Sequence, residues 1–498
     1  MTNSNDPITP LTSKLSTSKG AWTAAIIVMA ISLLSTFTLA TPNKSAAPTG
    51  PQVAAPQDLG PAGTDTVTDP AQQAAGPSGG AGVTGGGPAG GKTYDCSKGQ
   101  NAGATDVGVT AKSINFAATV VKTGIAKDFL TDAQYGIEAV KNKVNRAGGI
   151  CGRIINVAYL DDGWEPNRGA NIIQGWIGEK KYFGLAVNPS SEGLKGAIDG
   201  GYIRNAGFPV IGADGMLIDQ YKDPYVWPIA ISTSSIMHIM AQKAYADGAR
   251  TFGIAWESNY RFGVEGHDAF VGAVKRLGGT ISSDVGIQGG LNSYKTNADQ
   301  FITSCGGANT LDKCDFMAML LEPNTATQWV RDGGLGNPDK ARPKFGIGGP
   351  QPLFLRSFGV NCGKACANMT VWSSFKPPIP PFDTEPAVVT YKNDMNNVSS
   401  TADKNNPHVE GAYVGMLVLV EALKRLGPSP TRAAMKSTLD SLTLDTGLAP
   451  TLSFRPGNHF SNTSAQAFKA IVNNGSFSDW QYTQSGFLAD REVGKDIP

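Results

Sequence analysis

Charge is scarce and evenly balanced in this sequence. Charged residues make up 17% of the 498 residues, below the ~25% that is usual for soluble domains, and the formal net charge is +1. Such a chain has no overall electrostatic attraction to nucleic acid or to anionic lipid, which excludes nonspecific nucleic-acid binding. Glycine and proline are abundant instead, at 61 and 31 residues, which indicates that part of the chain is a linker.

The sequence also has few of the residue patterns that carry catalytic or metal chemistry. Its four histidines, His238, His267, His408 and His459, are scattered, and none lies in an H-E-x-x-H motif. Residues 86–93 match the phosphate-loop pattern by letter, but neither a strand before them nor a helix after them is expected, so we reject nucleotide binding. No nucleophile with an adjacent base stands out. We therefore expect no enzymatic activity, no cofactor and no metal.

A hydrophobic segment near the N-terminus indicates export. Residues 1–20 contain Lys14 and Lys19, and residues 21–41 have an apolar centre that fits either a cleaved signal peptide or a membrane anchor. Because the lysines lie on the N-terminal side, residues 1–20 are expected in the cytoplasm and the rest outside. The protein is thus expected to be extracytoplasmic, on the cell surface or secreted, with membrane contact only through this segment.

The next residues have the composition of a disordered linker. Residues 42–93 contain 12 Gly and 8 Pro, and no aromatic residue. Such a stretch cannot bury enough apolar surface to offset the entropy of ordering it. All six cysteines follow it, and an even number on the exported side predicts disulfides. Loop closure favours near neighbours, hence Cys305–Cys314 and Cys362–Cys366, which leaves Cys96–Cys151.

From residue 112 onward, short apolar runs alternate with stretches of helical periodicity. This alternation predicts an α/β fold with two doubly wound parallel-sheet lobes in series, each sheet covered on both faces. After Pro350 we expect a strand at 370–374 and a helix at 409–426, whose apolar surface on every side requires that it pack onto a lobe already formed. The other strands are expected near residues 114–121, 154–160, 183–187, 208–211, 252–256, 280–287, 315–321 and 344–348.

Several segments together carry a resemblance to a known family. They are residues 137–152, which close in Asn145 to Gly152, residues 159–163, Tyr260 with Gly263, and residues 410–427. In this order the chain resembles, over residues 110–490, the leucine/isoleucine/valine-binding proteins of bacterial ABC transporters, which have the type I periplasmic-binding fold. The resemblance implies hinge crossings near 232, 373 and 448. Lobe I then comprises residues 94–232 and 373–448, and lobe II residues 233–372 and 449–498.

Ligands of open α/β sheets bind beyond the carboxyl ends of the strands, so the loops at these ends form the expected cleft. Ser190 or Ser191 follows the third strand and matches the family serine that holds a ligand carboxylate, although either one also suits a plain helix cap. Ala213 and Asp214 follow the fourth strand. Tyr260 matches the family tyrosine that closes over the ligand from lobe II, and packing on its own helix is the alternative.

The ligand's charge is the open question. The family's acidic group for a ligand ammonium lies where this chain has the uncharged Gln351, so an ordinary amino acid is in doubt. Asp214 or Glu322 is the replacement, or else a solvated loop residue, and Lys122 and Thr123 add polar contacts after the first strand. The ligand is accordingly amino-acid-like, an amide or a small carboxylate.

The resemblance implies a solute-binding protein that binds a small molecule between its lobes, closes on it and is recognised by the membrane permease of an ABC importer. The alternatives are an extracellular ligand sensor, and less so an α/β enzyme.

Overall fold

The computed structural model describes residues 96, 100–307, 310–333, 343–367 and 369–495. The expected signal or anchor at residues 21–41 and the expected linker at residues 42–93 lie outside these residues. Among the residues that are described, no helix is both long and apolar enough to cross a bilayer.

The first sheet is parallel and is formed in two pairs. Strand β1 (Ser113–Val120) pairs with β2 (Ile154–Asp161), and β3 (Val210–Ala213) pairs with β4 (Val226–Pro228). Single bridges from Leu185 to Ala117 and to Val210 join the two pairs. The strand expected at residues 183–187 is thus reduced to isolated bridges. A physical reason lies in Pro209 of the neighbouring segment, which has no N–H to donate to a longer ladder.

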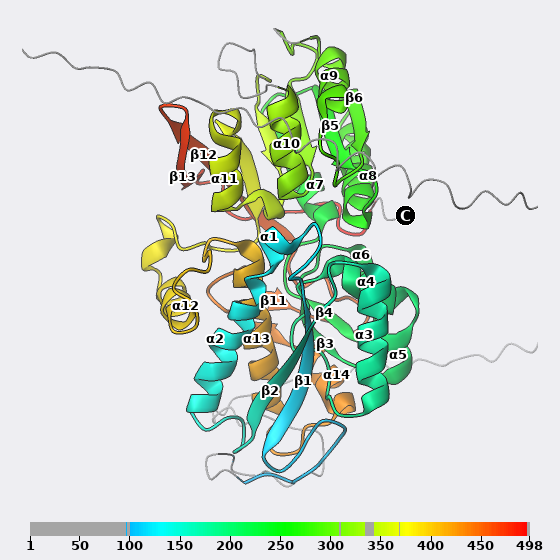
Figure 1. The fold of residues 1–498 in the computed structure, drawn as a ribbon, viewed down its shortest axis with the longest axis vertical. Coiled ribbons are helices and arrows are strands. Elements are labelled where there is room, and N and C mark those ends of the chain that lie inside the picture. The colour runs from blue at the N-terminus through cyan, green and yellow to red at the C-terminus, as the bar shows by residue number, and fades with distance from the viewer. Residues whose placement is uncertain (1–95, 97–99, 308–309, 334–342, 368, 496–498) are drawn as a thin grey trace, which may run out of the picture. The chain divides into compact units, whose positions relative to one another are not determined.

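Helices lie on both faces of this sheet, and we call the sheet with its helices the first lobe. Helices α2 (Ala133–Arg146) and α13 (Pro407–Leu426) pack together on one side, and α3 (Pro166–Glu179) and α4 (Ser191–Asp199) on the other (Figure 1). Helix α13 packs on α2 and β3, as its all-round apolar surface predicts. The remaining elements are α1 (Lys127–Leu130), α5 (Tyr202–Ala206), α6 (Ile218–Lys222), α12 (Pro386–Asn396), α14 (Arg432–Leu439) and the pair β10 (Thr443–Leu444) and β11 (Leu452–Ser453).

The second sheet has the strand order β13-β12-β9-β8-β7-β5-β6, with β14 beside β12. Its parallel part comprises β5 (Thr251–Glu257), β6 (Thr280–Ile287), β7 (Phe316–Leu320), β8 (Ile347–Gly349) and β9 (Thr370–Ser373). We call this sheet and the helices that alternate with its strands the second lobe. These helices are α7 (Thr233–Ala246), α8 (Arg261–Arg276), α9 (Lys295–Ser304), α10 (Pro323–Gly333) and α11 (Arg356–Cys362).

The expectation of an entirely parallel second sheet is wrong at one edge. Strand β12 (Ser464–Asn473) lies antiparallel between β9 and β13 (Ser476–Tyr482), and β14 (Leu488–Ala489) is antiparallel to β12. A tight hairpin is the physical reason, since Asn474 and Gly475 both adopt positive φ, at 51° and 79°. Asn-Gly is a strong hairpin signal, which the expectation of alternating strands and helices did not include.

Three disulfides join the cysteines in the pairs that loop closure favours. They are Cys96–Cys151, Cys305–Cys314 and Cys362–Cys366. The first ties the start of the described chain to the segment just before β2, and the other two close short loops in the second lobe.

Candidate functional site

The carboxyl ends of the two sheets meet around a small enclosed cavity. Its volume, about 10 Å³, is enough for roughly one water molecule. The first lobe contributes the loops after Leu185, β3 and β4, the second contributes Gln351, the segment after β9 contributes Phe375, and α13 contributes its first two turns. The lining residues are Val187, Asn188, Pro189, Gly212, Asp214, Ile229, Ala230, Gln351, Phe375, Pro407, His408, Gly411 and Ala412.

Two polar side chains at this cavity are buried, and each has one polar atom without a hydrogen-bond partner. Asp214 Oδ1 accepts a hydrogen bond from Gln220 Nε2 at 2.8 Å, whereas its Oδ2 has no partner. Burial raises the pKa of Asp214 to about 6, against the lowering effect of its hydrogen bonds. His408 Nε2 is likewise unpartnered, and burial lowers the pKa of His408 to about 4, so its imidazole is neutral. Asp214 and His408, two lining residues of one small cavity, thus each keep a buried polar atom without a hydrogen-bond partner.

Ser190 and Ser191 lie beside this cavity, where α4 begins, and both are fully buried. Ser190 Oγ donates to Asp162 Oδ1 at 2.9 Å, and Ser191 Oγ accepts from Trp164 Nε1 at 3.3 Å. Neither hydroxyl caps α4. Burial raises the pKa of Asp162 to about 6, and its Oδ2 is unpartnered. The hydroxyls therefore belong to a polar network that reaches the interface between the lobes.

An aromatic contact bridges the two lobes next to Ser191. The Trp164 indole follows β2 in the first lobe and lies 4.8 Å, centroid to centroid, from the ring of Tyr260, which precedes α8 in the second lobe. It also lies 5.8 Å from Phe262 and 6.0 Å from Phe129. Trp164 is only 1% exposed. The two lobes are therefore in direct contact through this side chain.

Two helix N-termini are capped by carboxylates from the opposite lobe. Glu192 on α4 accepts from the N–H of Arg261 at 3.0 Å at the start of α8, whose own first residues supply no side-chain cap. Reciprocally, Glu265 on α8 accepts from the N–H of Ile218 at 2.9 Å at the start of α6. Burial raises the pKa of Glu192 to about 7 and raises that of Glu265 as well. These caps form only while the lobes are closed.

Glu322 lies apart from Asp214 and Gln351, in a second cavity of about 290 Å³ whose lining includes Ile125, Tyr294, Asn324 and Gln328. Its carboxylate accepts from the N–H groups of Asn324, at 2.8 Å, and of Thr325 at the start of α10. Its own N–H donates to Glu257 Oε2 at 2.8 Å. Burial is the main reason that the pKa of Glu257 rises to about 8. The Glu322 carboxylate thus caps the N-terminus of α10.

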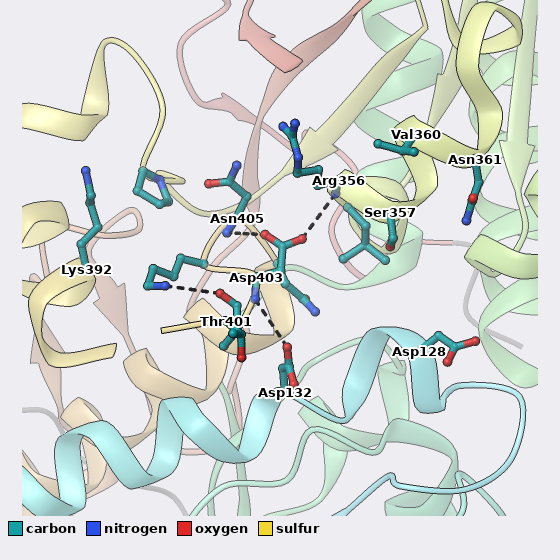
Figure 2. A pocket seen from close by; sticks show the side chains of 15 residues that line it. Asp128, Asp132, Arg356, Ser357, Val360, Asn361, Lys392, Thr401, Asp403 and Asn405 are labelled. Atoms are coloured by element: carbon teal, nitrogen blue, oxygen red, sulfur yellow. Dashed lines mark hydrogen bonds between the residues drawn. The ribbon is translucent and has the colours of Figure 1, made fainter. Parts of the chain in front are cut away.

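A groove of about 790 Å³ lies to one side of these contacts (Figure 2). It is lined from α1, α2, α11, α12 and the loop before α13. Asp403 lies near its centre, where its carboxylate accepts from the N–H groups of Asn405 at 3.0 Å and Arg356 at 3.4 Å, as Figure 2 shows. Both acidic and basic side chains line the groove, and none of the sequence-predicted ligand residues does so.

The structure therefore brings together some of the sequence-predicted residues and separates others. Ser190, Ser191, Ala213, Asp214 and Gln351 gather at the enclosed cavity or in the network beside it. The Ala213 carbonyl already accepts from Ile229 N–H at 3.0 Å, and Gln351 Oε1 from Ser374 N–H and Oγ. Tyr260 faces Trp164 rather than only its own helix. Lys122 and Thr123 lie in an exposed turn, where both bond to Asp161.

Sequence reasoning missed four residues of this region: Asp162, Trp164, Glu192 and His408. A signal for the first two existed, because both directly follow β2 at its carboxyl end, the position that flagged Ser190. His408 carried no such signal, since it lies in the first turn of a helix more than 200 residues further along the chain. In the sequence, Glu192 is simply an acidic residue in the first turn of a helix, which is common. Only the packing of the two lobes shows that it caps α8.

Two α/β lobes whose sheets present their carboxyl ends to a shared crevice define the class of two-lobed solute-binding proteins. Residues 113–474 match the family model described as periplasmic binding protein. The chain belongs to this family, in its type I, leucine/isoleucine/valine-binding-like form, and is a solute-binding protein of the ABC-transporter type. A search of curated proteins gives no match.

Solved structures share the fold at low sequence identity. A possible leucine/isoleucine/valine-binding protein from Rhodopirellula baltica SH 1 is 16% identical with a TM-score of 0.62, over 79% of this chain and 100% of that one. A fatty acid ABC transporter substrate-binding protein from Thermomonospora curvata is 15% identical with a TM-score of 0.61, over 78% and 94%. A solute-binding protein from R. palustris in complex with 4-hydroxybenzoate is 14% identical with a TM-score of 0.62, over 76% and 98%.

Proposed function

We propose that the protein captures a small molecule between its lobes and delivers it to the membrane permease of an ABC importer, with no catalytic step of its own. The observation that carries this proposal is the crevice where both sheets end, whose lining residues Asp214 and His408 each keep one buried polar atom, Oδ2 and Nε2, without a partner. Buried polar atoms without partners are costly, so a ligand that supplies their hydrogen bonds gains binding energy there.

The proposed ligand is amino-acid-like, or an amide or small carboxylate of similar size. Asp214 replaces the charge that Gln351 lacks and accepts a ligand N–H or ammonium group, while neutral His408 accommodates either a donor or an acceptor. The related structures bind chemically diverse ligands: the R. palustris protein holds 4-hydroxybenzoate and the T. curvata protein is described as a fatty acid binder. The fold therefore does not determine the ligand class, and we infer that class from the polar side chains of Asp214 and His408 instead.

We further propose that hinge crossings lie near residues 232, 373 and 448, so that lobe I comprises 94–232 and 373–448 and lobe II the remainder up to 498. Residues 21–41 and 42–93 are proposed to export and to tether these lobes outside the membrane. Because the enclosed cavity holds only about one water molecule, the lobes must separate at these hinges before a ligand enters.

A thermal-shift screen of the full chain, disulfides intact, tests the proposal against amino acids, amides and small carboxylates. A ligand at 100 times its Kd should add about 2.7 kcal/mol to the free energy of unfolding. We expect a shift with at least one of these classes, and we expect Asp214→Asn to abolish the shift for amino acids while leaving small carboxylates unaffected. Asp219→Asn on nearby α6, outside the cavity lining, is the control. An absence of any shift would point to sensing of a larger molecule instead.

A further inference from the structure

Trp164 is placed at the lobe interface by a tight turn at the end of β2. Gly163 N–H donates to Asp161 Oδ1 at 3.0 Å, and Trp164 N–H donates to Asp162 Oδ1 at 2.9 Å. Trp164 itself has a φ of 64°, a left-handed conformation that is rare for a bulky residue. Strained backbone of this kind persists where the surroundings enforce it, and it concentrates at functional sites. The indole then lies between Phe129 and Ser191 of the first lobe and Tyr260 and Phe262 of the second.

The indole contacts two residues that are expected to hold the ligand. Its Nε1–H donates to Ser191 Oγ at 3.3 Å, and its ring lies 4.8 Å from that of Tyr260. Ser191 is a candidate for the ligand's polar end and Tyr260 for closure over it. Both are engaged by a side chain of the chain itself, and the adjoining cavity has room for only about one water molecule. A ligand that contacts Ser191 and Tyr260 together must therefore take the position of the indole.

We propose that Trp164 is a specificity-determining residue, whose indole occupies the ligand's position in the ligand-free protein. Ligands bind by displacing the indole. Ligands with a planar ring are favoured because they restore the stack on Tyr260. This inference rests on the proposed function only for the identity of what displaces the indole. Branched aliphatic ligands have no ring that could replace the aromatic contacts with Tyr260, Phe262 and Phe129.

The distance between the lobes provides the first test. Spin labels at Gln174→Cys on α3 and Lys275→Cys on α8, both exposed, report that distance by pulsed electron paramagnetic resonance in the full chain. We expect Trp164→Ala to lengthen and broaden the distance distribution, and added indole to restore the short distance. Trp329→Ala removes a tryptophan that is equally buried within the second lobe, beside Phe301 at 5.3 Å, and should leave the distance unchanged. Trp164→Phe keeps a ring on Tyr260 and should stay mostly closed.

Tryptophan emission provides the second test, with phenylalanine, benzamide and benzoate as planar probes and leucine, acetamide and propionate as matched aliphatic ones. Planar probes should shift wild-type emission to the red as the indole enters solvent, and no such shift should occur in Trp164→Phe.

If Trp164→Ala keeps the wild-type distance and loses only thermal stability, as Trp329→Ala does, Trp164 is a plain core residue and the inference fails. If a probe binds without moving the emission, the inference also fails while the proposed function stands. If Trp164→Ala opens and indole recloses it while no probe binds wild type, the proposed function fails instead.

Discussion

Replacing Glu257 by glutamine should stabilise the protein at alkaline pH by about 2 to 4 kcal/mol and leave it nearly unchanged at pH 5. Glu257 is fully buried at the end of β5, its Oε1 is unpartnered, and burial together with the nearby carboxylates of Glu322 and Glu192 raises its pKa from 4.5 to about 8. A shift of this size corresponds to roughly 5 kcal/mol of differential stability. The glutamine side chain would keep an acceptor for the Glu322 N–H without the buried charge.

The sign follows from proton binding. Below pH 4.5 the Glu257 carboxyl is protonated in both the folded and the unfolded chain, and its contribution to stability is complete. As the pH rises toward 8, the unfolded chain releases the proton while the folded chain retains it, so the free energy of unfolding falls. Chemical denaturation at pH 5, 7 and 9 measures this slope. Asp162, Glu192 and Asp214, whose pKa values are also raised by burial, add to it in the same direction.

Glu421→Gln serves as the control for this prediction. Glu421 is a partly exposed residue of α13 paired with Arg425, and removing such a surface ion pair should change stability by less than about 1 kcal/mol at every pH. If Glu257→Gln follows the wild-type pH profile in parallel, the buried charge at this position is not what sets it.

Gly212→Ala should destabilise the first lobe by about 2 to 4 kcal/mol. Gly212 lies on β3 with a φ of 82°, and an added Cβ would lie 2.6 Å from Gly415 Cα, the backbone of α13. Left-handed conformation costs an alanine ~1 to 2 kcal/mol, and overpacking against rigid backbone adds ~1 to 3 kcal/mol. The urea midpoint of unfolding should fall accordingly.

Gly175→Ala is the matched control, because Gly175 lies inside α3 and an added Cβ meets nothing within 4 Å. Alanine should stabilise the chain there by about 0.5 to 1 kcal/mol. Equal midpoints for the two variants would contradict the close contact between β3 and α13.

The sequence predicted most of the α/β framework because its apolar runs have the two periods that distinguish strands from helices. β6 matches its expected range of 280–287, and most other expected strands begin within a few residues of the observed ones. The hairpin of β12 and β13 was missed because after Pro350 only one strand, at 370–374, and one helix, at 409–426, were expected. The segment at 183–187 was expected as a full strand because apolarity alone does not reveal that Pro209 interrupts its partner.

The site was harder to predict than the fold. Position at a strand's carboxyl end identified Ser190, Ser191 and Asp214, because that rule depends only on sheet direction. It placed Glu322 in the same site, although the side chain bends back to cap α10. Trp164 and the caps formed by Glu192 and Glu265 depend on contacts between lobes, and such contacts join residues about 45 to 100 positions apart that no local pattern relates.

The chain order of α13 and β12 has a consequence for synthesis on the ribosome. Helix α13 covers β3 in the first lobe, and β12, which begins at Ser464, completes the pairing of β9 in the second. A nascent chain that has reached residue 400 therefore holds an uncovered apolar face on one sheet and an unpaired edge on the other. Both are exposed for several seconds at ~5 to 20 residues per second, and unpaired strand edges of this kind seed aggregation. The first lobe has all of its elements once β11 has emerged, whereas the second still lacks β12, so the second lobe is the last to be completed and its open edge is the longer-lived hazard.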